Sequence, residues 1–196
     1  MKWQADWAQL RQKTCLSGHY DFGFWPLLEQ GLKTKVEPVF ITMLRDPLER
    51  ALSLYHWYGH EEQRYQAEVS KMTFEQFARD TRPDWTFLDN DAVRRIAGVR
   101  RGAKGGCIDA VDLERAISNL SYFPMVGLTE RFDESVGRWA KLLGWESAEY
   151  DTERVQGDRL RAHQLDKGTI EAVYHRQRYD NILYHYVKAR YWEGQV

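Results

Sequence analysis

The sequence predicts an α/β fold, and three observations support that class. Two apolar segments rich in β-branched and aromatic residues, 38–44 and 122–128, are typical of buried strands. Each runs directly into a segment with helical spacing, 47–58 and 129–143. The chain has 196 residues, of which 43% are hydrophobic, so we expect one globular domain, 1–196, with a core of its own.

The first strand–helix unit is the segment around which we expect the rest to be organised. Asp46 suits the N-cap position, Pro47 the first helical position, and Glu49 the first turn. A strand that ends at such a helix presents backbone N–H groups and a positive dipole end, which favour an anion. Arg45 at the strand end and Ser53 on the polar side of the helix suit a phosphate monoester. An ordinary strand–helix unit with a surface arginine explains the same residues equally well.

Before this unit, residues 3–12 have the spacing of a short amphipathic helix, and 14–17 the composition of a short strand. Gly18 and Gly23 then bracket a loop that contains His19. Imidazole, with an ordinary pKa of about 6.5, suits a general base, although a loop histidine is more often a solvated side chain. Residues 21–32 predict a short helix broken at Pro26.

After the unit, Thr73 and Gln76 have the spacing of a capping box that opens a short helix, stopped before Pro83. The segment 89–98 predicts a helix on which Asn90 and Arg94 share a face, either as site residues or as a cap and a solvated arginine. The basic, glycine-rich segment 100–106 favours a surface loop over a phosphate cradle. Further helices are expected at 112–120, 169–178 and 180–193, with hydrophobic contacts at Trp85 and Phe87 and a polar loop at 146–161.

Composition excludes several classes of function. With 28 basic and 29 acidic residues, the chain has no charge excess that would favour nucleic acid or an acidic membrane. Cys15 and Cys107 form neither a disulfide framework nor a metal-ligand spacing. No membrane span or signal peptide is visible, so we expect a soluble, cytoplasmic protein.

The motif Arg45-Asp46-Pro47-x-x-Arg50-x-x-Ser53 resembles the 3′-phosphate-binding segment of sulfotransferases that use 3′-phosphoadenosine 5′-phosphosulfate (PAPS). The residues of this motif are most similar to those of carbohydrate sulfotransferases of the heparan sulfate 2-O type. Three further stretches resemble segments of the same family and occur in its order. They are Ser-Gly-His-x-x-Phe-Gly at 17–23, Asn-x-x-x-Arg-x-Ile-Ala-Gly at 90–98, and Val-Gly-Leu-Thr-Glu-Arg-Phe-Asp-Glu-Ser at 126–135.

The resemblance implies a three-layer α/β domain with a parallel sheet flanked by helices, related to the P-loop nucleotide kinases. It implies in-line transfer of a sulfonate group from PAPS to a hydroxyl, usually of a carbohydrate, with PAP (3′-phosphoadenosine 5′-phosphate) as product and without a metal. The residues that it implies are His19 as base, Arg45, Ser53, Thr129 and Arg131 around PAPS, and Asn90 and Arg94 near the acceptor.

The family's first strand and the Lys-Thr loop that grips the 5′-phosphosulfate have no counterpart in the sequence. Lys13-Thr14-x-x-Ser17 is superficially similar, but no apolar strand precedes it and no glycines allow backbone to close on phosphate. We therefore expect an N-terminally incomplete domain with unpaired sheet backbone, or one completed by another segment or subunit, including a homo-oligomer. The alternative function is a non-catalytic protein that binds PAP or an anionic glycan. A small kinase-like enzyme is disfavoured because no ATP-binding P-loop is present.

Overall fold

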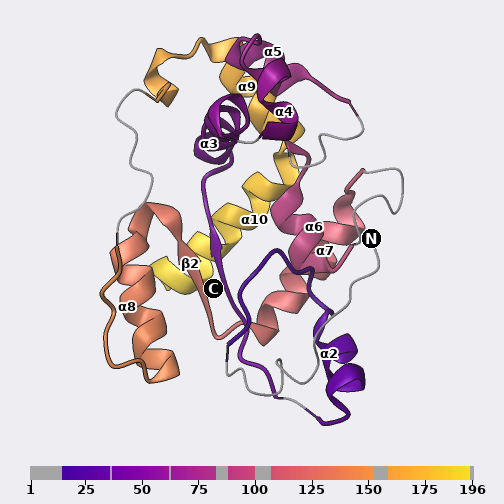
Figure 1. The fold of residues 1–196 in the computed structure, drawn as a ribbon, viewed down its shortest axis with the longest axis vertical. Coiled ribbons are helices and arrows are strands. Elements are labelled where there is room, and N and C mark those ends of the chain that lie inside the picture. The colour runs from indigo at the N-terminus through magenta and orange to yellow at the C-terminus, as the bar shows by residue number, and fades with distance from the viewer. Residues whose placement is uncertain are drawn as a thin grey trace.

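The computed structural model describes residues 15–35, 37–61, 63–82, 88–99, 107–151 and 159–194, and shows a mixed, mostly helical α/β fold (Figure 1). Over these residues the sheet has two strands, β1 (Ile41–Leu44) and β2 (Met125–Leu128). They pair in parallel, with Ile41 opposite Met125 and Leu44 opposite Leu128. The α/β class is thus confirmed, whereas the larger three-layer sheet of the P-loop kinase type stays a prediction.

The first strand–helix unit forms as its sequence predicts. Strand β1 leads into α3 (Pro47–His60), whose N-cap is Asp46 and whose first turn holds Pro47 and Glu49. The apolar face of α3 is buried against other helices, while Ser53 lies on the more polar side. Proline at the first turn loses no hydrogen bond, because that N–H would have no helical partner.

The second strand continues through a 3₁₀ turn, η4 (Thr129–Arg131), into α8 (Phe132–Leu143). Helix α8 packs closely on β2 because Gly127 has no side chain. A Cβ there would lie 2.9 Å from the Trp139 ring and 3.0 Å from the Ser135 side chain. The buried Ser135 hydroxyl lies 2.8 Å from the Arg131 carbonyl oxygen and also bonds the backbone of Leu128, so it fixes the start of α8.

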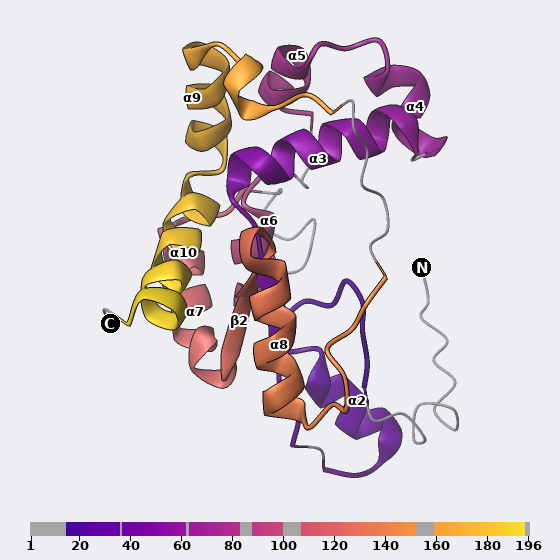
Figure 2. The ribbon, with the colours of Figure 1, turned by 90° about the vertical axis from the view of Figure 1, so that its left-hand side faces the viewer.

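The remaining helices surround these two units (Figures 1 and 2). The capping box of Thr73 and Gln76 is confirmed at α5, and Asp109 forms a second one at α7. The elements and their bounds are α2 (Trp25–Leu32), α4 (Gln63–Val69), α5 (Phe74–Arg79), α6 (Asp91–Ala97), α7 (Ala110–Asn119), η3 (Leu120–Tyr122), η5 (Ala162–Gln164), α9 (Lys167–Arg176), α10 (Arg178–Lys188) and a π-helical turn η6 (Ala189–Glu193).

Among the described residues, two clusters of buried apolar side chains form the core. The first lies between the strands and helices α6, α7 and α10, and includes Leu44, Val93, Val126 and Leu183. The second lies under α3, between α4, α5 and α9, and includes Ala51, Phe77 and Val173. Helix α3 contacts both α9 and α10, so the strand ends lie where the two clusters meet.

The outer edge of β2 is partly covered by the C-terminal π-helical turn. The Trp192 indole Nε1 donates to the Val126 carbonyl oxygen at 3.0 Å. The Tyr191 hydroxyl lies 2.9 Å from both the Leu120 and the Phe123 carbonyl oxygens, which share its single hydrogen. Side chains thereby satisfy backbone groups near a strand edge that would otherwise lack a strand partner.

Two local predictions were wrong. Residues 15–17 form no strand, and Pro26 does not break α2 but lies in its first turn, where proline is tolerated. The predicted helix 3–12, Lys13-Thr14, Trp85, Phe87 and the basic segment 100–106 lie outside the described residues. Each helix in the described part of the chain is too short or too polar to span a membrane.

Candidate functional site

The two strands end side by side, and side chains join their ends. The Thr129 hydroxyl donates to the Leu44 carbonyl oxygen at 3.1 Å. The Asp46 backbone N–H donates to Glu130 Oε1 at 2.8 Å. Because parallel strands bring their carboxyl ends to one edge, the residues after β1 and β2 form a common polar surface below α3.

The N-terminus of α3, which the sequence suggests as an anion site, is already occupied by the chain's own carboxylate. Asp46 Oδ1 accepts from Leu48 N at 2.9 Å and from Glu49 N at 3.1 Å. The next amide, Arg50 N, donates to the Asp46 carbonyl oxygen at 2.8 Å. The expectation of free backbone N–H groups is therefore wrong, and an anion here must be held by side chains.

Two tyrosines close the carboxylate side of this surface. The Tyr174 hydroxyl from α9 donates to Asp46 Oδ2 at 3.2 Å. Burial, and then the charge of Asp46, raise the pKa of Tyr174 to about 12. Burial, and then the charge of Glu130, likewise raise the pKa of Tyr184 on α10 to about 12. Both phenols stay protonated at neutral pH and act as donors that hold the two carboxylates in place.

Arg45 lies beside this carboxylate group but is only loosely paired. Its closest ion-pair contact is Glu49 at 3.5 Å, and 25% of its side chain is exposed. Burial, and then the positive charge of Arg159, lower the pKa of Arg45. Arg159 thus opposes the charge of Arg45, while the carboxylates of Glu49, Glu130 and Asp46 favour it.

The charge of Arg159 also affects His56 on the polar face of α3. Burial, then His60 and Arg159, lower the pKa of His56. The segment 159–166 passes along α3 (Figure 2), and Arg159 affects both Arg45, before the helix, and His56, in its third turn. Ser53 lies between these two on the same face, three residues before His56. We call Arg45, Ser53, His56 and Arg159 the strand-end cluster.

The hydrogen-bonding capacity of this cluster is not used up. Among the described residues, neither Ser53 nor Arg159 has a side-chain hydrogen bond or an ion pair. His56 Nε2 is buried and also makes no hydrogen bond to the described chain. By contrast, Arg50, the third polar residue of the Arg45 motif, points to the other side of α3 and pairs with Asp91 at 2.9 Å.

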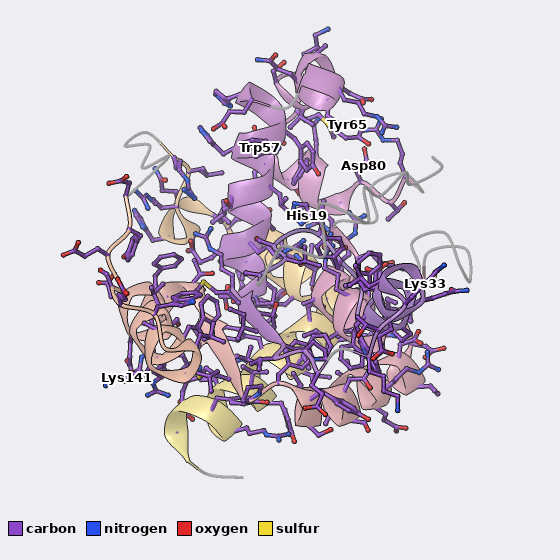
Figure 3. All side chains as sticks on the ribbon, turned by 60° about the horizontal axis from the view of Figure 1, so that its bottom comes forward. His19, Lys33, Trp57, Tyr65, Asp80 and Lys141 are labelled. Atoms are coloured by element: carbon purple, nitrogen blue, oxygen red, sulfur yellow. The ribbon has the colours of Figure 1, made fainter. Side chains whose placement is uncertain are left out.

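The other predicted site residues lie apart from this cluster. His19 is exposed on the loop before α2, which docks through the Phe22 N–H on the Arg95 carbonyl oxygen at 2.7 Å. Figure 3 labels His19 on this loop and Trp57 on α3. Within the described chain, His19 has no hydrogen bond or ion pair. Arg131 pairs with Glu134 and stacks on the Trp192 ring, with Cζ 4.6 Å from its centroid.

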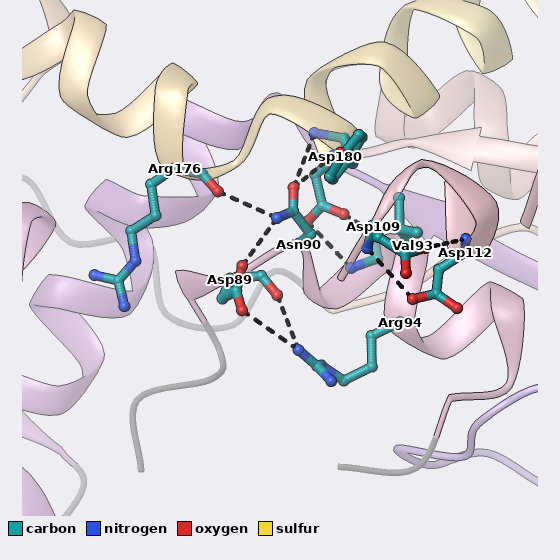
Figure 4. A network of polar contacts seen from close by, with 10 residues as sticks. Asp89, Asn90, Val93, Arg94, Asp109, Asp112, Arg176 and Asp180 are labelled. Atoms are coloured by element: carbon teal, nitrogen blue, oxygen red, sulfur yellow. Dashed lines mark hydrogen bonds and ion pairs between the residues drawn. The ribbon is translucent and has the colours of Figure 1, made fainter. Parts of the chain in front are cut away.

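Asn90 and Arg94 belong to a separate, buried network (Figure 4). The Asn90 side-chain oxygen accepts from Tyr179 N at 2.9 Å and Asp180 N at 3.1 Å. Its Nδ2 donates to Asp89 Oδ1 at 2.9 Å and to the Arg176 carbonyl oxygen at 3.2 Å. All four hydrogen-bonding positions of the amide are therefore filled by the chain itself.

The other side chains of the network also bond backbone groups of the chain itself. Arg94, 1% exposed, donates to the Asp89 carbonyl oxygen at 3.3 Å. Asp180 accepts from Val93 N at 2.8 Å and Ala92 N at 3.1 Å, so α10 caps α6 while Asn90 caps α10. Complete burial raises the pKa of Asp180 to about 6. These contacts join helices, and a substrate-binding role for Asn90 and Arg94 stays a prediction.

The sequence interpretation missed two members of the cluster. His56 had a usable signal, because it follows Ser53 by three residues and so shares its helix face. Arg159 had none, because it lies in a polar stretch more than 100 residues from Arg45, and only the fold brings it near.

No metal site is evident among the described residues, where no three His, Cys, Asp or Glu side chains are placed to hold an ion. Comparison with family models, curated proteins and solved structures gave no match for this chain.

Proposed function

We propose that this chain binds PAPS at the strand-end cluster and transfers its sulfonate group to a hydroxyl, usually of a carbohydrate. The observation that carries the proposal is that Arg45 has only one long ion pair and feels the charge of Arg159, while the Ser53 hydroxyl on the helix that follows makes no hydrogen bond to the described residues. The motif that resembles the family's 3′-phosphate segment supplies Arg45 and Ser53, and the 3′-phosphate is the group assigned to them.

A phosphate monoester matches this cluster in charge and in hydrogen bonding. It carries close to two negative charges at neutral pH and three acceptor oxygens. Guanidinium groups donate to such oxygens in a planar fork, and the serine hydroxyl adds one more donor. A phosphate bound by both arginines would offset the repulsion between them, although it would also meet the carboxylates of Asp46, Glu49 and Glu130 that act on Arg45. Thr129, whose hydroxyl bonds the Leu44 carbonyl oxygen next to Arg45, would border the nucleotide.

For the transfer step, the family resemblance assigns His19 as the base that deprotonates the acceptor hydroxyl. The acceptor oxygen attacks sulfur while the bond from sulfur to the 5′-phosphate oxygen breaks, and His19 takes the acceptor proton. Catalysis in such an in-line displacement consists mainly of positioning and charge stabilisation. The exposed His19 loop has to approach the cluster for this step.

A second candidate is a non-catalytic protein that binds PAP or an anionic glycan. Two observations favour it. His19 makes no polar contact with the cluster, and the N-terminal amides of α3 are occupied by Asp46. A glycan sulfate would use the same donors but would not distinguish the nucleotide's 3′-phosphate.

Calorimetry with PAP and with adenosine 5′-phosphate tests the binding site. The two ligands differ only in the 3′-phosphate, so PAP should bind more tightly. Arg45→Ala should weaken PAP binding about 100-fold, because charge-assisted hydrogen bonds contribute about 1.5–3 kcal/mol each. Arg79→Ala is the matched control, because Arg79 also pairs with a glutamate four residues away, Glu75, at 3.1 Å. Unchanged PAP affinity in Arg45→Ala would overturn the site.

A sulfate-transfer assay then separates the two candidates. With PAPS and a panel of carbohydrate acceptors, His19→Ala should abolish transfer and leave PAP affinity unchanged. PAP binding without transfer to any acceptor in the wild-type chain would favour the non-catalytic protein. Binding of a sulfated glycan with no preference for PAP over adenosine 5′-phosphate would indicate a glycan site.

A further inference from the structure

The turn between β1 and α3 is held by two side chains from near the other end of the chain. The Tyr174 hydroxyl on α9 donates to Asp46 Oδ2 at 3.2 Å. Gln177, which joins α9 to α10, donates from Nε2 to the Pro47 carbonyl oxygen at 3.3 Å. The two donors are three residues apart and so act from one face. Their partners are the two residues that follow Arg45 directly in the chain.

The backbone on the other side of Arg45 is held as well. The Leu44 carbonyl oxygen accepts from the Thr129 hydroxyl at 3.1 Å, and the Asp46 N–H donates to Glu130 Oε1 at 2.8 Å. Side chains from the turn after β2 and from α9 thus fix the residues before and after Arg45. Because a side chain starts from its own backbone, the Arg45 guanidinium is presented from a fixed position. A ligand that binds there has less of the protein to order.

Gln177 has a feature that favours a positioning role over a stabilising one. Its side chain is 1% exposed, and its Oε1 is buried without a hydrogen bond to the described residues. A buried acceptor without a partner is destabilising, and an apolar side chain of similar shape would avoid this loss. The Pro47 carbonyl oxygen also has a helical partner within α3, so it does not depend on Gln177 for one. The contact therefore locates the start of α3 more than it stabilises the fold.

We propose that Tyr174 and Gln177 are positioning residues, which hold the turn after β1 so that Arg45 is presented to a phosphate monoester before the ligand arrives. This inference rests on the proposed function, because it concerns the same arginine. Both side chains act through Arg45 rather than through a contact of their own with the ligand. The alternative is that the two contacts only join α9 to α3. That alternative predicts a loss of stability without a specific effect at Arg45.

Calorimetry with PAP on two conservative variants tests the inference. Tyr174→Phe keeps the ring and removes the hydroxyl, and Gln177→Met keeps the length and removes the amide. Each should weaken PAP binding about fivefold, the factor that corresponds to one net hydrogen bond. The urea midpoint of Gln177→Met should equal or exceed that of the wild-type chain, because its unpaired oxygen is removed too. A protein that is at least as stable but binds PAP more weakly is not expected from a merely structural residue.

Tyr55→Phe is the matched control. Tyr55 and Tyr174 both pack against the second core cluster, and the Tyr55 hydroxyl donates to the Met72 carbonyl oxygen at 2.6 Å. Tyr55→Phe therefore removes one phenol hydrogen bond from the same core without touching the turn after β1. It should lower the urea midpoint about as much as Tyr174→Phe does, and it should leave PAP affinity unchanged.

A double-mutant cycle shows whether Tyr174 acts through Arg45. In the Arg45→Ala background, Tyr174→Phe should cause no further loss of PAP affinity, because the side chain that it positions is gone. The same fivefold loss in both backgrounds would overturn the inference.

The outcomes also separate this inference from the proposed function. If PAP binds and Arg45→Ala weakens it, but Tyr174→Phe and Gln177→Met bind PAP like the wild-type chain, positioning is wrong and the proposed function stands. If PAP does not bind the wild-type chain, both are wrong.

Discussion

Arg45 and Arg94 carry the same side chain, and both lie in motifs that resemble the same enzyme family. Arg94 is 1% exposed, and its side chain contacts Asp89 just before its own helix, α6. Arg45 is a quarter exposed, has one long contact to Glu49, and faces a second arginine. The Asn90 amide next to Arg94 fills all four of its hydrogen-bonding positions within the chain, whereas Ser53 and Arg159 of the strand-end cluster make no side-chain hydrogen bond to the described residues.

The difference lies in how much binding capacity remains after folding. A buried polar group must find partners within the chain, because leaving it unpaired costs about 1–3 kcal/mol. A cluster at a strand end, partly open to water, can keep unpaired donors at a smaller cost. A sequence motif locates polar residues in both places, but only the remaining capacity indicates where a ligand can bind.

The largest contrast is expected in the stability of two arginine variants. Arg94→Ala removes one of the largest fully buried side chains and should lower the free energy of unfolding by about 3–5 kcal/mol. Arg45→Ala should change it by about 0.5 kcal/mol or less, because its pairing is weak. Urea denaturation measures both. Equal losses would show that Arg45 is a structural residue and would remove the contrast.

Asn90 provides the next test. Its backbone φ is 48°, which asparagine and glycine adopt more readily than alanine. Asn90→Gly should cost about 2–3 kcal/mol through lost hydrogen bonds, and Asn90→Ala about 1 kcal/mol more through backbone strain. Asn119→Ala, which removes a single bond to the Ile96 carbonyl oxygen at 2.8 Å, is the control and should cost about 1 kcal/mol. A stable Asn90→Gly that loses ligand binding would instead place Asn90 in the site.

Asp180 allows the buried network to be tested by pH. Its folded pKa of about 6 lies above the ordinary value of 3.8, so the folded state holds this proton more tightly. Its contribution to stability is therefore fully present below pH 4 and is lost as pH rises through 6. Asp180→Asn should remove about 2 kcal/mol of this pH dependence. Unfolding free energies of the wild-type protein and of Asp180→Asn, measured from pH 4 to 7, check this direction. Parallel curves for the two proteins would contradict a raised pKa of Asp180.

The smallest effect is expected at Glu49, the carboxylate that pairs with Arg45. Glu49→Gln removes the only ion-pair partner of Arg45 among the described residues, without emptying a buried site. PAP affinity should rise about twofold to threefold, in keeping with about 0.5 kcal/mol for an exposed pair. Glu75→Gln, at the corresponding Arg79 pair, should leave affinity unchanged. Calorimetry decides, and a weaker PAP affinity in Glu49→Gln would mean that this carboxylate positions Arg45.

Local rules predicted the first strand–helix unit well. Asp46, Pro47 and Glu49 occupy the positions that capping preferences assign them, and Thr73 and Gln76 form the expected capping box. Such features depend on residues within one turn of each other. The short strand at 14–17 and the break at Pro26 were wrong because composition alone does not supply a strand partner or decide which turn holds a proline.

By itself, the sequence determined where α3 and α5 begin, which faces are apolar, and that two strands each run into a helix, because these depend on neighbouring residues. Only the tertiary structure decided which polar groups are left for a ligand. It placed Asp46 on the amides of α3, turned Arg50 towards Asp91, and brought Arg159 to Arg45. Hydrogen bonds and charges act through space over a few ångströms, so the partners that use up or leave open each side chain come from distant parts of the chain.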